Sequence, residues 1–182
     1  MINSKREKGF SLIELLIVVA IILIIAAIAI PNLIRARIAA NQSSAAASLR
    51  TLASSSAMYS STYQDGYPGS LTVMGPPASG NPTCDLAGLI DNVLANAAAA
   101  PGKSGYTFTW VVGAAQVATP PAGCAAGGYT DMFSVQADPL SASSGTVYYC
   151  VDATNVIRQN ASGVAVNATA AGCDPAANPI GQ

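Results

Sequence analysis

The stretch KREKGFSLIELLIVVAIILIIAAIAIP, residues 5–31, decides how this chain is organised. From Phe10 to Ile30 it runs for 21 residues, in which Ser11 and Glu14 are the only polar side chains. At ~1.5 Å per residue, a helix of this length covers the ~30 Å hydrocarbon core of a bilayer. The segment is therefore predicted to be a helix that can span a membrane. Glu14 is its anomaly, because a charged side chain is costly in hydrocarbon and is interpreted first as a functional residue.

Three basic residues, Lys5, Arg6 and Lys8, precede the apolar run. By the positive-inside rule they keep the N-terminus in the cytoplasm, so that the rest of the chain lies outside. A secretory signal peptide is the ordinary alternative, and the small residues 26–29 (AAIA) offer a cleavage site for it. Cleavage at that point would leave Glu14 without an explanation.

The residues KGFSLIE, 8–14, followed by the apolar run and Pro31, resemble the prepilin signature of type IV pilins and type II secretion pseudopilins. The resemblance implies that a membrane peptidase cuts after Gly9 and methylates the new N-terminal amine of Phe10. Glu14 is then the fifth residue of the mature chain, where the family has its glutamate.

The resemblance also implies a division of the chain into three segments. Residues 1–9 are the leader peptide, residues 10–33 the transmembrane and filament-core helix, and residues 34–182 the globular head. The expected fold is α+β, with a long N-terminal helix whose hydrophobic half protrudes and whose other half packs on a small antiparallel sheet.

Glu14 acquires a role in filament assembly from this resemblance. In a dry filament core it can pair with the positively charged amino group of Phe10 on a neighbouring subunit, where the attraction is far stronger than in water. Each charge alone is costly to bury, and the pair much less so. The alternative is a lone glutamate near the membrane interface that snorkels or becomes protonated.

The composition argues against an enzyme. Histidine is absent, which excludes Ser-His-Asp and Cys-His catalysis and most zinc sites. After the leader, five basic residues stand against eight acidic ones, with no basic face that would indicate nucleic-acid binding. We therefore expect a structural chain without a cofactor or a metal ion.

The helical pattern continues past the apolar run. Apolar residues recur at spacings of three, four or seven from Ile34 to Tyr63, as in an amphipathic helix. One helix is predicted from about Ser11 to Gln64, with a kink or a locally melted stretch at Pro31, which lacks an N–H group. We expect Pro31 to contribute packing flexibility during assembly.

The remaining pattern predicts a small sheet. Tyr106, Phe108 and Trp110 alternate with threonines, as in a half-buried strand. A turn is expected at Asp138-Pro139 and Gly145, and residues 159–182 are expected to form a loop-like tail. In chain order the other predicted elements are a Gly/Pro-rich connection over 66–82, a short amphipathic helix over 85–97, and strands over 106–112, 129–137, 146–152 and 156–158.

Four cysteines, at positions 84, 124, 150 and 173, contain no CxxC pair. An oxidising compartment favours disulfides between them. The alternative is a site in which four thiolates bind one metal ion. Three pairings are possible. We favour Cys84 with Cys124 and Cys150 with Cys173, because the second bond would pin the tail to the sheet.

Three further patterns have both a functional and an ordinary interpretation. Tyrosines four residues apart, at 59, 63 and 67, form either an aromatic path or simple packing. The acids Asp131, Asp138, Asp152 and Asp174 are either calcium ligands or turn residues, and their spacing is not that of a calcium loop. The tripeptides at Asn41, Asn160 and Asn167 match the N-glycosylation pattern, which also arises by chance.

Two functions follow from the resemblance. The first is a type IV pilus subunit for adhesion, twitching motility or DNA uptake, and the second is a pseudopilin of a type II secretion system. A membrane-anchored enzyme or binding protein is a third class, against which the lack of a catalytic constellation stands. The implied partners are other copies of the chain, the prepilin peptidase, the inner-membrane assembly platform with its secretin, and membrane lipid before assembly.

Overall fold

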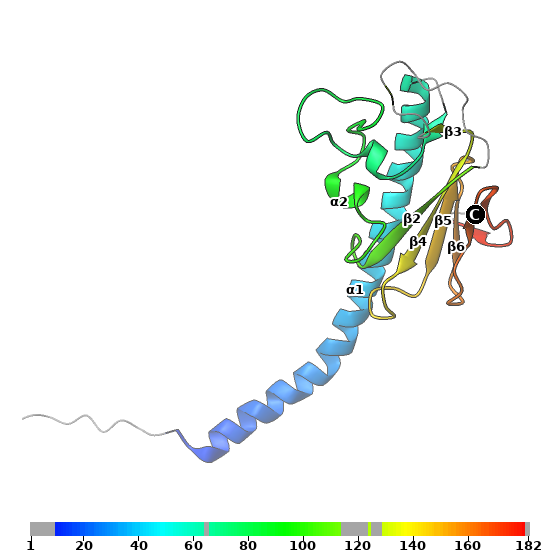
Figure 1. Ribbon diagram of the computed structural model, residues 1–182. Coiled ribbons are helices and arrows are strands. Elements are labelled where there is room, and N and C mark those ends of the chain that lie inside the picture. Colours follow the sequence, from blue (N-terminus) through cyan, green and yellow to red (C-terminus); the bar gives the residue numbers. More distant parts are fainter. Residues whose placement is uncertain (1–9, 64–65, 114–123, 125–128, 181–182) are drawn as a thin grey trace, which may run out of the picture. The chain divides into compact units, whose positions relative to one another are not determined.

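The computed structural model describes residues 10–63, 66–113, 124 and 129–180. It divides into two compact units, 1–37 and 38–182. One helix, α1 (Leu12–Tyr63), begins in the first unit and ends in the second (Figure 1). The predicted helix is thereby confirmed, although its expected last residue, Gln64, lies outside the described residues. A melted stretch at Pro31 is wrong because α1 is helical on both sides of it, while the kink stays a prediction.

Within the second unit, α1 packs through small residues and leucines. Leu49 and Leu52 have no exposed surface, and alanine and serine flank them on the same face. Such short side chains let a sheet approach the helix closely, and the spacing of three and four keeps them on one stripe. The buried residues of the stripe are Ala45, Ala46, Ser48, Leu49, Leu52, Ala53, Ser55, Ser56 and Tyr59.

A five-stranded antiparallel sheet lies against this stripe. Its order is β2-β4-β5-β6-β9, so the first four strands form the expected meander. The register places Trp110, Val135, Val151 and Ile157 in one row across four strands. The strands are β2 (Tyr106–Val112), β4 (Phe133–Pro139), β5 (Tyr148–Asp152), β6 (Ile157–Asn160) and β9 (Asn178–Pro179).

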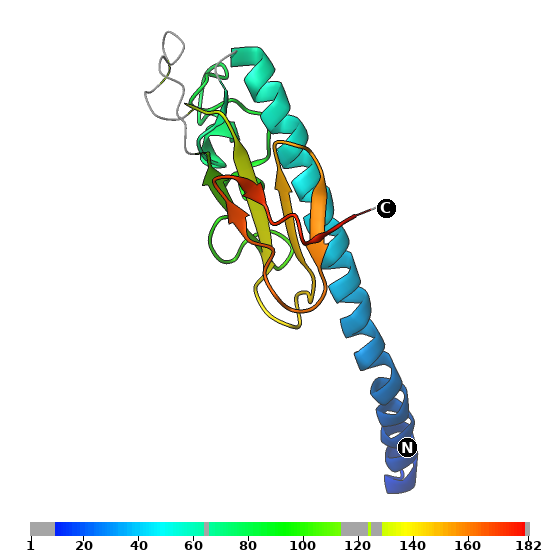
Figure 2. The same ribbon diagram turned by 90° about the vertical axis from the view of Figure 1, so that its right-hand side faces the viewer.

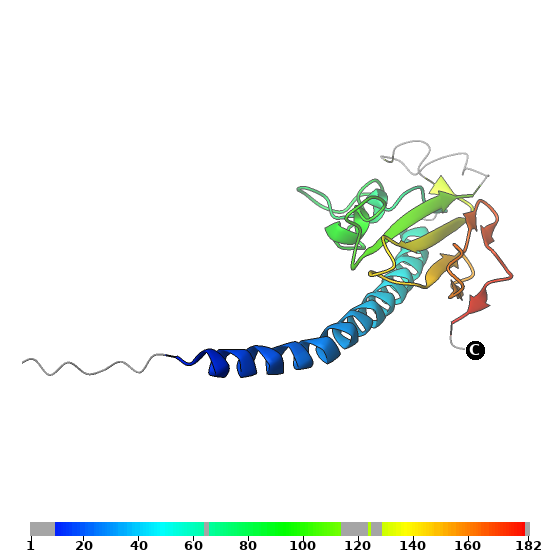
Figure 3. The same ribbon diagram turned by 90° about the horizontal axis from the view of Figure 1, so that it is seen from below.

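The second unit has three layers. The C-terminal part of α1, which belongs to this unit, lies on one face of the sheet, and the last part of the chain lies on the other face (Figures 2 and 3). Alternation along β5 produces this arrangement, because Tyr149 and Val151 belong to the core with α1 whereas Cys150 packs with Val166 and Cys173. The strand pattern therefore supplies side chains to both faces.

The predicted helix over 85–97 is wrong for most of its length. Helix α2 is confined to Asn92–Ala95. Residues 87–90 instead donate their backbone N–H groups to carbonyls of residues 73–75, at 2.8–3.1 Å. Gly88 has a φ of 66°, which a right-handed helix does not accommodate. The apolar spacing was helical, but these residues pack against the short 3₁₀ helix η1 (Thr72–Met74).

The predicted strand over 129–137 is broken in two. Its beginning, β3 (Tyr129–Thr130), pairs with β1 (Tyr67–Pro68) in a separate two-stranded sheet. The hydroxyl of the fully buried Thr130 donates to the carbonyl of Met132 at 2.7 Å. This bond closes a bend, after which β4 continues in the main sheet.

The predicted turn at Asp138-Pro139 and Gly145 is confirmed at Gly145 and wrong at Asp138 and Pro139. Asp138 and Pro139 lie in β4 and pair with β2, where Pro139, at the strand end, stands opposite Tyr106. The turn comes later, where Gly145 N donates to Ser141 O at 3.1 Å. A Cβ atom at Gly145 would collide with the phenol of Tyr106, so packing against β2 requires glycine there.

The tail over 159–182 is more ordered than predicted. It contains the hairpin of β7 (Ala168–Thr169) and β8 (Gly172–Cys173), and β9 extends the main sheet beside β6. These strands are two residues long, too short to show an alternating pattern in the sequence. Backbone hydrogen bonds to neighbouring strands, rather than local propensity, produce them.

Candidate functional site

The N-terminal end of α1 is closed by Glu14 itself. The backbone N–H of Ser11 donates to Glu14 Oε2 at 2.9 Å, and the carbonyl of Ser11 accepts from Leu15 N at 3.3 Å. Ser11 is therefore the N-cap residue and Glu14 the third helical residue, which is the glutamate half of a capping box. The negative charge also lies at the positive end of the helix dipole. Glu14 thus has a structural partner within its own chain.

Phe10 precedes this cap and is exposed, with 80% of its surface accessible. The predicted cleavage residue before it, Gly9, lies outside the described residues. The position of Phe10 one residue before the N-cap brings its backbone nitrogen and Glu14 to the same end of the helix. Cleavage after Gly9 and methylation of Phe10 stay predictions.

The first half of α1 presents its apolar side chains on every face. Accessible fractions run from 44% at Val19 to 76% at Leu12. An 18-residue window of α1 has a mean hydropathy of 3.3, long and apolar enough to cross a membrane by length and composition. A helix that is apolar all round is stable only where lipid or protein covers it. The described part of the chain does not supply that cover.

Pro31 and Asn32 introduce a local change in the hydrogen bonding of this segment. Pro31 has no N–H, so the carbonyl of Ala27 loses its helical donor. Asn32 Nδ2 donates to the carbonyl of Ile28 at 3.0 Å, which satisfies its amide within the helix. Asn32 is a polar residue that the sequence analysis did not single out.

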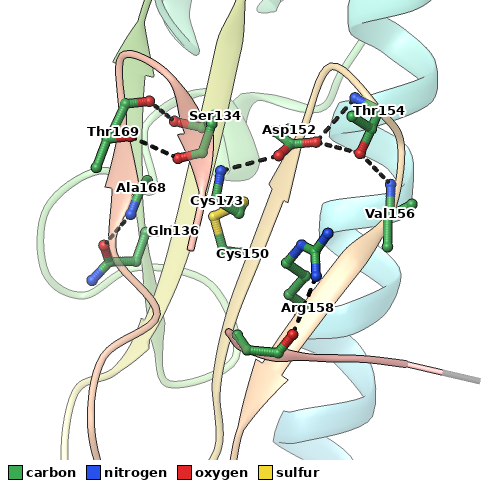
Figure 4. The surroundings of a disulfide bond; sticks show 12 residues. Ser134, Gln136, Cys150, Asp152, Thr154, Val156, Arg158, Ala168, Thr169 and Cys173 are labelled. Atoms are coloured by element: carbon green, nitrogen blue, oxygen red, sulfur yellow. Dashed lines mark hydrogen bonds between the residues drawn. A yellow bond between two sulfur atoms is a disulfide. The ribbon is translucent and has the colours of Figure 1, made fainter. Parts of the chain in front are cut away.

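On the far face of the sheet, the tail is fixed by a disulfide (Figure 4). Cys150 of β5 and Cys173 of β8 are bonded, with Cα atoms 5.9 Å apart. Both residues are buried, at 0% and 8% exposure. This is the pairing that we favoured from the sequence, and it pins the tail to the sheet.

Asp152 adds a polar lock next to this disulfide (Figure 4). Its Oδ2 accepts from the backbone N–H of Cys173 at 3.0 Å, and its Oδ1 accepts from the N–H and hydroxyl of Thr154 at 3.0 and 2.5 Å. Burial raises the pKa of Asp152, but these hydrogen bonds and the charge of Arg158 outweigh it, so that the pKa lies below its ordinary value. The carboxylate is therefore held in its charged form.

Arg158 of β6 is a second contact to the tail. Its Nη1 donates to the carbonyls of Pro175 and Ala177, at 3.3 Å each. Disulfide, carboxylate and guanidinium thus hold three points of the tail. No sequence signal indicated the contacts of Asp152 and Arg158 with the tail, because these partners are backbone atoms more than fifteen residues away.

A second disulfide lies at the other end of the head. Cys84 and Cys124 are bonded, with Cα atoms 5.6 Å apart, which is again the favoured pairing. The fully buried Tyr59 donates its hydroxyl to the carbonyl of Cys84 at 2.6 Å, and its ring lies 4.7 Å from that of Tyr63. Tyr67 packs edge-on against Phe133. The tyrosines that are four residues apart therefore serve packing.

The remaining acids are turn or strand residues. Asp138 accepts two hydrogen bonds from Gln136, at 2.7 and 2.8 Å, and its burial raises its pKa. Asp174 accepts from the N–H of Ala176 within a turn. Within the described ranges, no three His, Cys, Asp or Glu side chains come together as a metal site.

Ser11 is the functional residue that a closer use of the sequence would have found. The spacing S-x-x-E, from Ser11 to Glu14, is the signature of a capping box. The signature predicts that the glutamate caps its own helix, in addition to the predicted pairing between subunits. The geometry assigns it a first role in starting its own helix.

Comparison with known proteins matches part of the chain. Residues 4–30 match the family model described as the prokaryotic N-terminal methylation motif. The chain is 55% identical over 49 residues to the type IV major pilin protein PilA of Myxococcus xanthus, a match that covers 27% of this chain and 22% of PilA. It is 51% identical over 55 residues to the type IV wide pilus major component PilA4 of Thermus thermophilus, covering 30% of this chain and 42% of PilA4.

The matched stretches are thus less than half of either relative, and no solved structure matches this chain significantly. Both relatives are named as pilus components. The motif at the N-terminus and the long helix packed with an antiparallel sheet agree with them. The chain is similar to type IV pilins and carries the N-terminal methylation motif.

Proposed function

We propose that this chain is a structural subunit of a type IV pilus and not an enzyme. Before assembly it is stored in the inner membrane through residues 10–33, with the leader 1–9 in the cytoplasm and the head 34–182 outside. After cleavage behind Gly9 it polymerises through its N-terminal helix into a filament on the cell surface. Adhesion, motility or DNA uptake are the uses that such a filament serves.

One observation carries this proposal. The first half of α1 exposes its large apolar side chains all round, whereas the second half buries one stripe against the sheet. A bilayer and a bundle of identical helices are two surroundings that cover such a surface in turn. The named pilus components among the relatives support the filament over a secretion pseudopilus.

Glu14 provides the register of assembly in this proposal. Its Oε2 already accepts the N–H of Ser11, so Oε1 is available to a second donor. That donor is the methylated ammonium group of Phe10 on a neighbouring subunit. Cap and pair are compatible, because a carboxylate accepts several hydrogen bonds, and both keep the charge satisfied in the filament core.

The proposed partners follow from these steps. The prepilin peptidase acts on the bond between Gly9 and Phe10, and lipid covers residues 10–33 until polymerisation. The inner-membrane assembly platform adds subunits, and the secretin lets the filament leave the cell. Pro31, where the helix lacks one hydrogen bond, is the position at which we expect the helix to adapt to its neighbours.

Mass spectrometry of filaments sheared from the cell surface tests the proposal. The expected subunit begins with N-methylated Phe10, and deletion of its gene removes the filaments. Replacing Gly9 with a bulky residue should leave full-length protein in the membrane. A mature start near residue 28 or 30 would instead indicate an ordinary signal peptide, and mature protein only in a periplasmic secretion complex would favour the pseudopilin.

A further inference from the structure

The chain contains three tripeptides with the N-glycosylation pattern, and the structure separates them. They begin at Asn41 in α1, at Asn160 at the end of β6, and at Asn167 next to β7. An acceptor asparagine must offer its Nδ2 atom to a transferase, and the site must lie on an accessible segment. The three sites differ in both respects.

The site at Asn41 is engaged through its amide and the third site through its hydroxyl residue, although Asn167 itself is exposed. Asn41 lies in the middle of a helix, and its Nδ2 donates to the carbonyl of Ser144 at 2.9 Å. In the third tripeptide, the hydroxyl of Thr169 donates to the carbonyl of Gly172 at 2.9 Å, and the N–H of Ala168 donates to the side chain of Gln136 at 3.1 Å. A transferase would have to break the hydrogen bond of the Asn41 amide at the first site and that of the Thr169 hydroxyl at the third.

Asn160 is arranged differently. Its Oδ1 accepts from the backbone N–H of Ser162 at 2.8 Å and from the hydroxyl of Ser162 at 2.6 Å. The asparagine and the hydroxyl residue of the tripeptide therefore already meet, and within the described residues Nδ2 makes no hydrogen bond. The Asn160 atom that faces Ser162 is identified as Oδ1, because the backbone N–H of Ser162 only donates and must face an oxygen.

The surface around this turn is open. Asn160 itself is half-buried, residues 161–163 are exposed, and a Cβ atom built on Gly163 would meet no atom within 4 Å. Beside the turn lies a shallow groove of ≈ 500 Å³, lined in part by Ser141, Thr146 and Tyr148. Hydroxyl groups around an aromatic residue are suited to the polar and apolar faces of a sugar ring. The fold thus leaves room for a saccharide on Asn160.

We propose that Asn160 is the acceptor of an N-linked glycan, added outside the cytoplasmic membrane. Its donor is an oligosaccharide carried on a lipid diphosphate. A bond forms between Nδ2 and the anomeric carbon of the first sugar, while the bond from that carbon to the diphosphate oxygen breaks. The amide proton passes to a base of the transferase, and the lipid diphosphate leaves. The step rests on the export of the head under the proposed function.

Trypsin digestion of filaments from the producing cells separates the sites. After reduction of the disulfides, cleavage after Arg37, Arg50 and Arg158 releases the peptide 38–50 with Asn41 and the peptide 159–182 with the other two asparagines. Fragmentation that preserves glycans should locate a sugar mass on Asn160, with Asn41 and Asn167 unmodified. The peptide that begins at Phe10 reports processing in the same digest, so failure of this proposal and failure of the proposed function are distinguishable.

Four variants sharpen the assignment. Asn160→Gln and Ser162→Ala should each abolish the added mass, whereas Ser162→Thr and the matched control Asn167→Gln should retain it. A sugar that survives Asn160→Gln, including one on Ser162, overturns the proposal. So does an unmodified Asn160 in filaments whose subunits begin correctly at Phe10.

Discussion

Two halves of one helix behave in opposite ways. Leu23, in the first half of α1, has 63% of its surface exposed, whereas Leu52, in the second half, has none. Both are leucines in regular helical backbone, so helix propensity does not distinguish them. The first half is apolar all round and needs lipid or other subunits, while the second half has one apolar stripe that the sheet covers. Stability of the head and assembly of the filament are therefore separable properties.

The carboxylates of Glu14 and Asp152 differ in the same way as the two halves of α1. Glu14 accepts one backbone N–H at an exposed helix end, and Asp152 accepts three hydrogen bonds beside a buried disulfide. Asp152 is completely used by its own fold, whereas Glu14 retains an oxygen for a second donor. Mutations should accordingly affect either the filament or the head, but not both.

The largest effect is expected from Glu14→Ala. It leaves the amine of a neighbouring Phe10 buried and unpaired, at a cost of ~3–5 kcal/mol per contact. The yield of filaments relative to cleaved subunit should fall about 100-fold or more, since 1.4 kcal/mol is a factor of ten. Insertion, cleavage and folding of the head should remain intact. The measurement compares sheared filaments with cleaved subunit in the membrane.

Glu14→Gln is the matched control for this experiment. Glutamine still caps the helix, because the capping box accepts either residue, but it lacks the charge. It should assemble poorly, although better than alanine. Normal filament yield from Glu14→Gln would show that capping suffices, and normal yield from cleaved Glu14→Ala would exclude charge pairing altogether.

The second effect compares the two leucines directly. Leu52→Ala should lower the free energy of unfolding of the head by about 2–5 kcal/mol, because it removes packed side-chain volume and leaves a cavity. Leu23→Ala should leave that free energy unchanged. The fluorescence of Trp110, the single tryptophan, which stacks on Phe133, reports unfolding of the full chain in detergent. Equal destabilisation by both variants would contradict the separation of the two halves.

Removal of the tail disulfide should have a somewhat smaller effect. Cys150→Ala together with Cys173→Ala opens a loop with a sequence separation of 23, worth ~3 kcal/mol in the chain-entropy model. The tail should become sensitive to protease while α1 keeps its helical circular dichroism. The Cys84 and Cys124 pair, changed in the same way, serves as the control that leaves the tail protected. An equally protected tail in both double variants would mean that Asp152 and Arg158 hold it alone.

The smallest effect depends on pH. Asp152→Asn should cost roughly 1–3 kcal/mol at neutral pH, because it weakens hydrogen bonds to a charged acceptor. The pKa of Asp152 is lowered by folding, so its contribution is present above the pKa of the unfolded carboxyl, about 3.9, and is lost as the pH falls. The difference between wild type and variant should therefore shrink from pH 6 to pH 3 in denaturant titrations.

For Asp138→Asn, the stability difference from wild type should change with pH in the opposite direction. Folding raises the pKa of Asp138 through burial, so protonation favours the folded state and acidification should reduce the cost of this carboxylate. Wild type should thus gain stability relative to Asp138→Asn as the pH falls. A constant difference for Asp152→Asn over the same range would show that its charge does not contribute.

Much of the fold could be predicted from local pattern. The long helix, the strand Tyr106–Val112 and the order of the meander follow from periodicities of 3.6 and 2, which depend on neighbouring residues alone. The favoured cysteine pairing is confirmed by both disulfides.

What failed depended on partners far along the chain. Residues 87–90 have a helical apolar spacing, yet their N–H groups bond to residues 73–75. The bend at Thr130 and the glycine requirement beside Tyr106 arise where two distant segments approach. Backbone hydrogen bonds must be satisfied somewhere, and tertiary packing decides between a local and a distant partner.

The sequence by itself determined the parts of this protein that act without the rest of the fold. An apolar run of membrane length, a charge at its beginning and a processing motif are chemical properties of consecutive residues. Only the tertiary structure decided which carboxylate is fully hydrogen-bonded within its own chain, which tail segments become strands and which asparagine amides are engaged in hydrogen bonds. These properties depend on contacts between residues remote in sequence. An example is the hydrogen bond from Cys173 N–H to Asp152 Oδ2 at 3.0 Å, which the pattern of neighbouring residues does not predict.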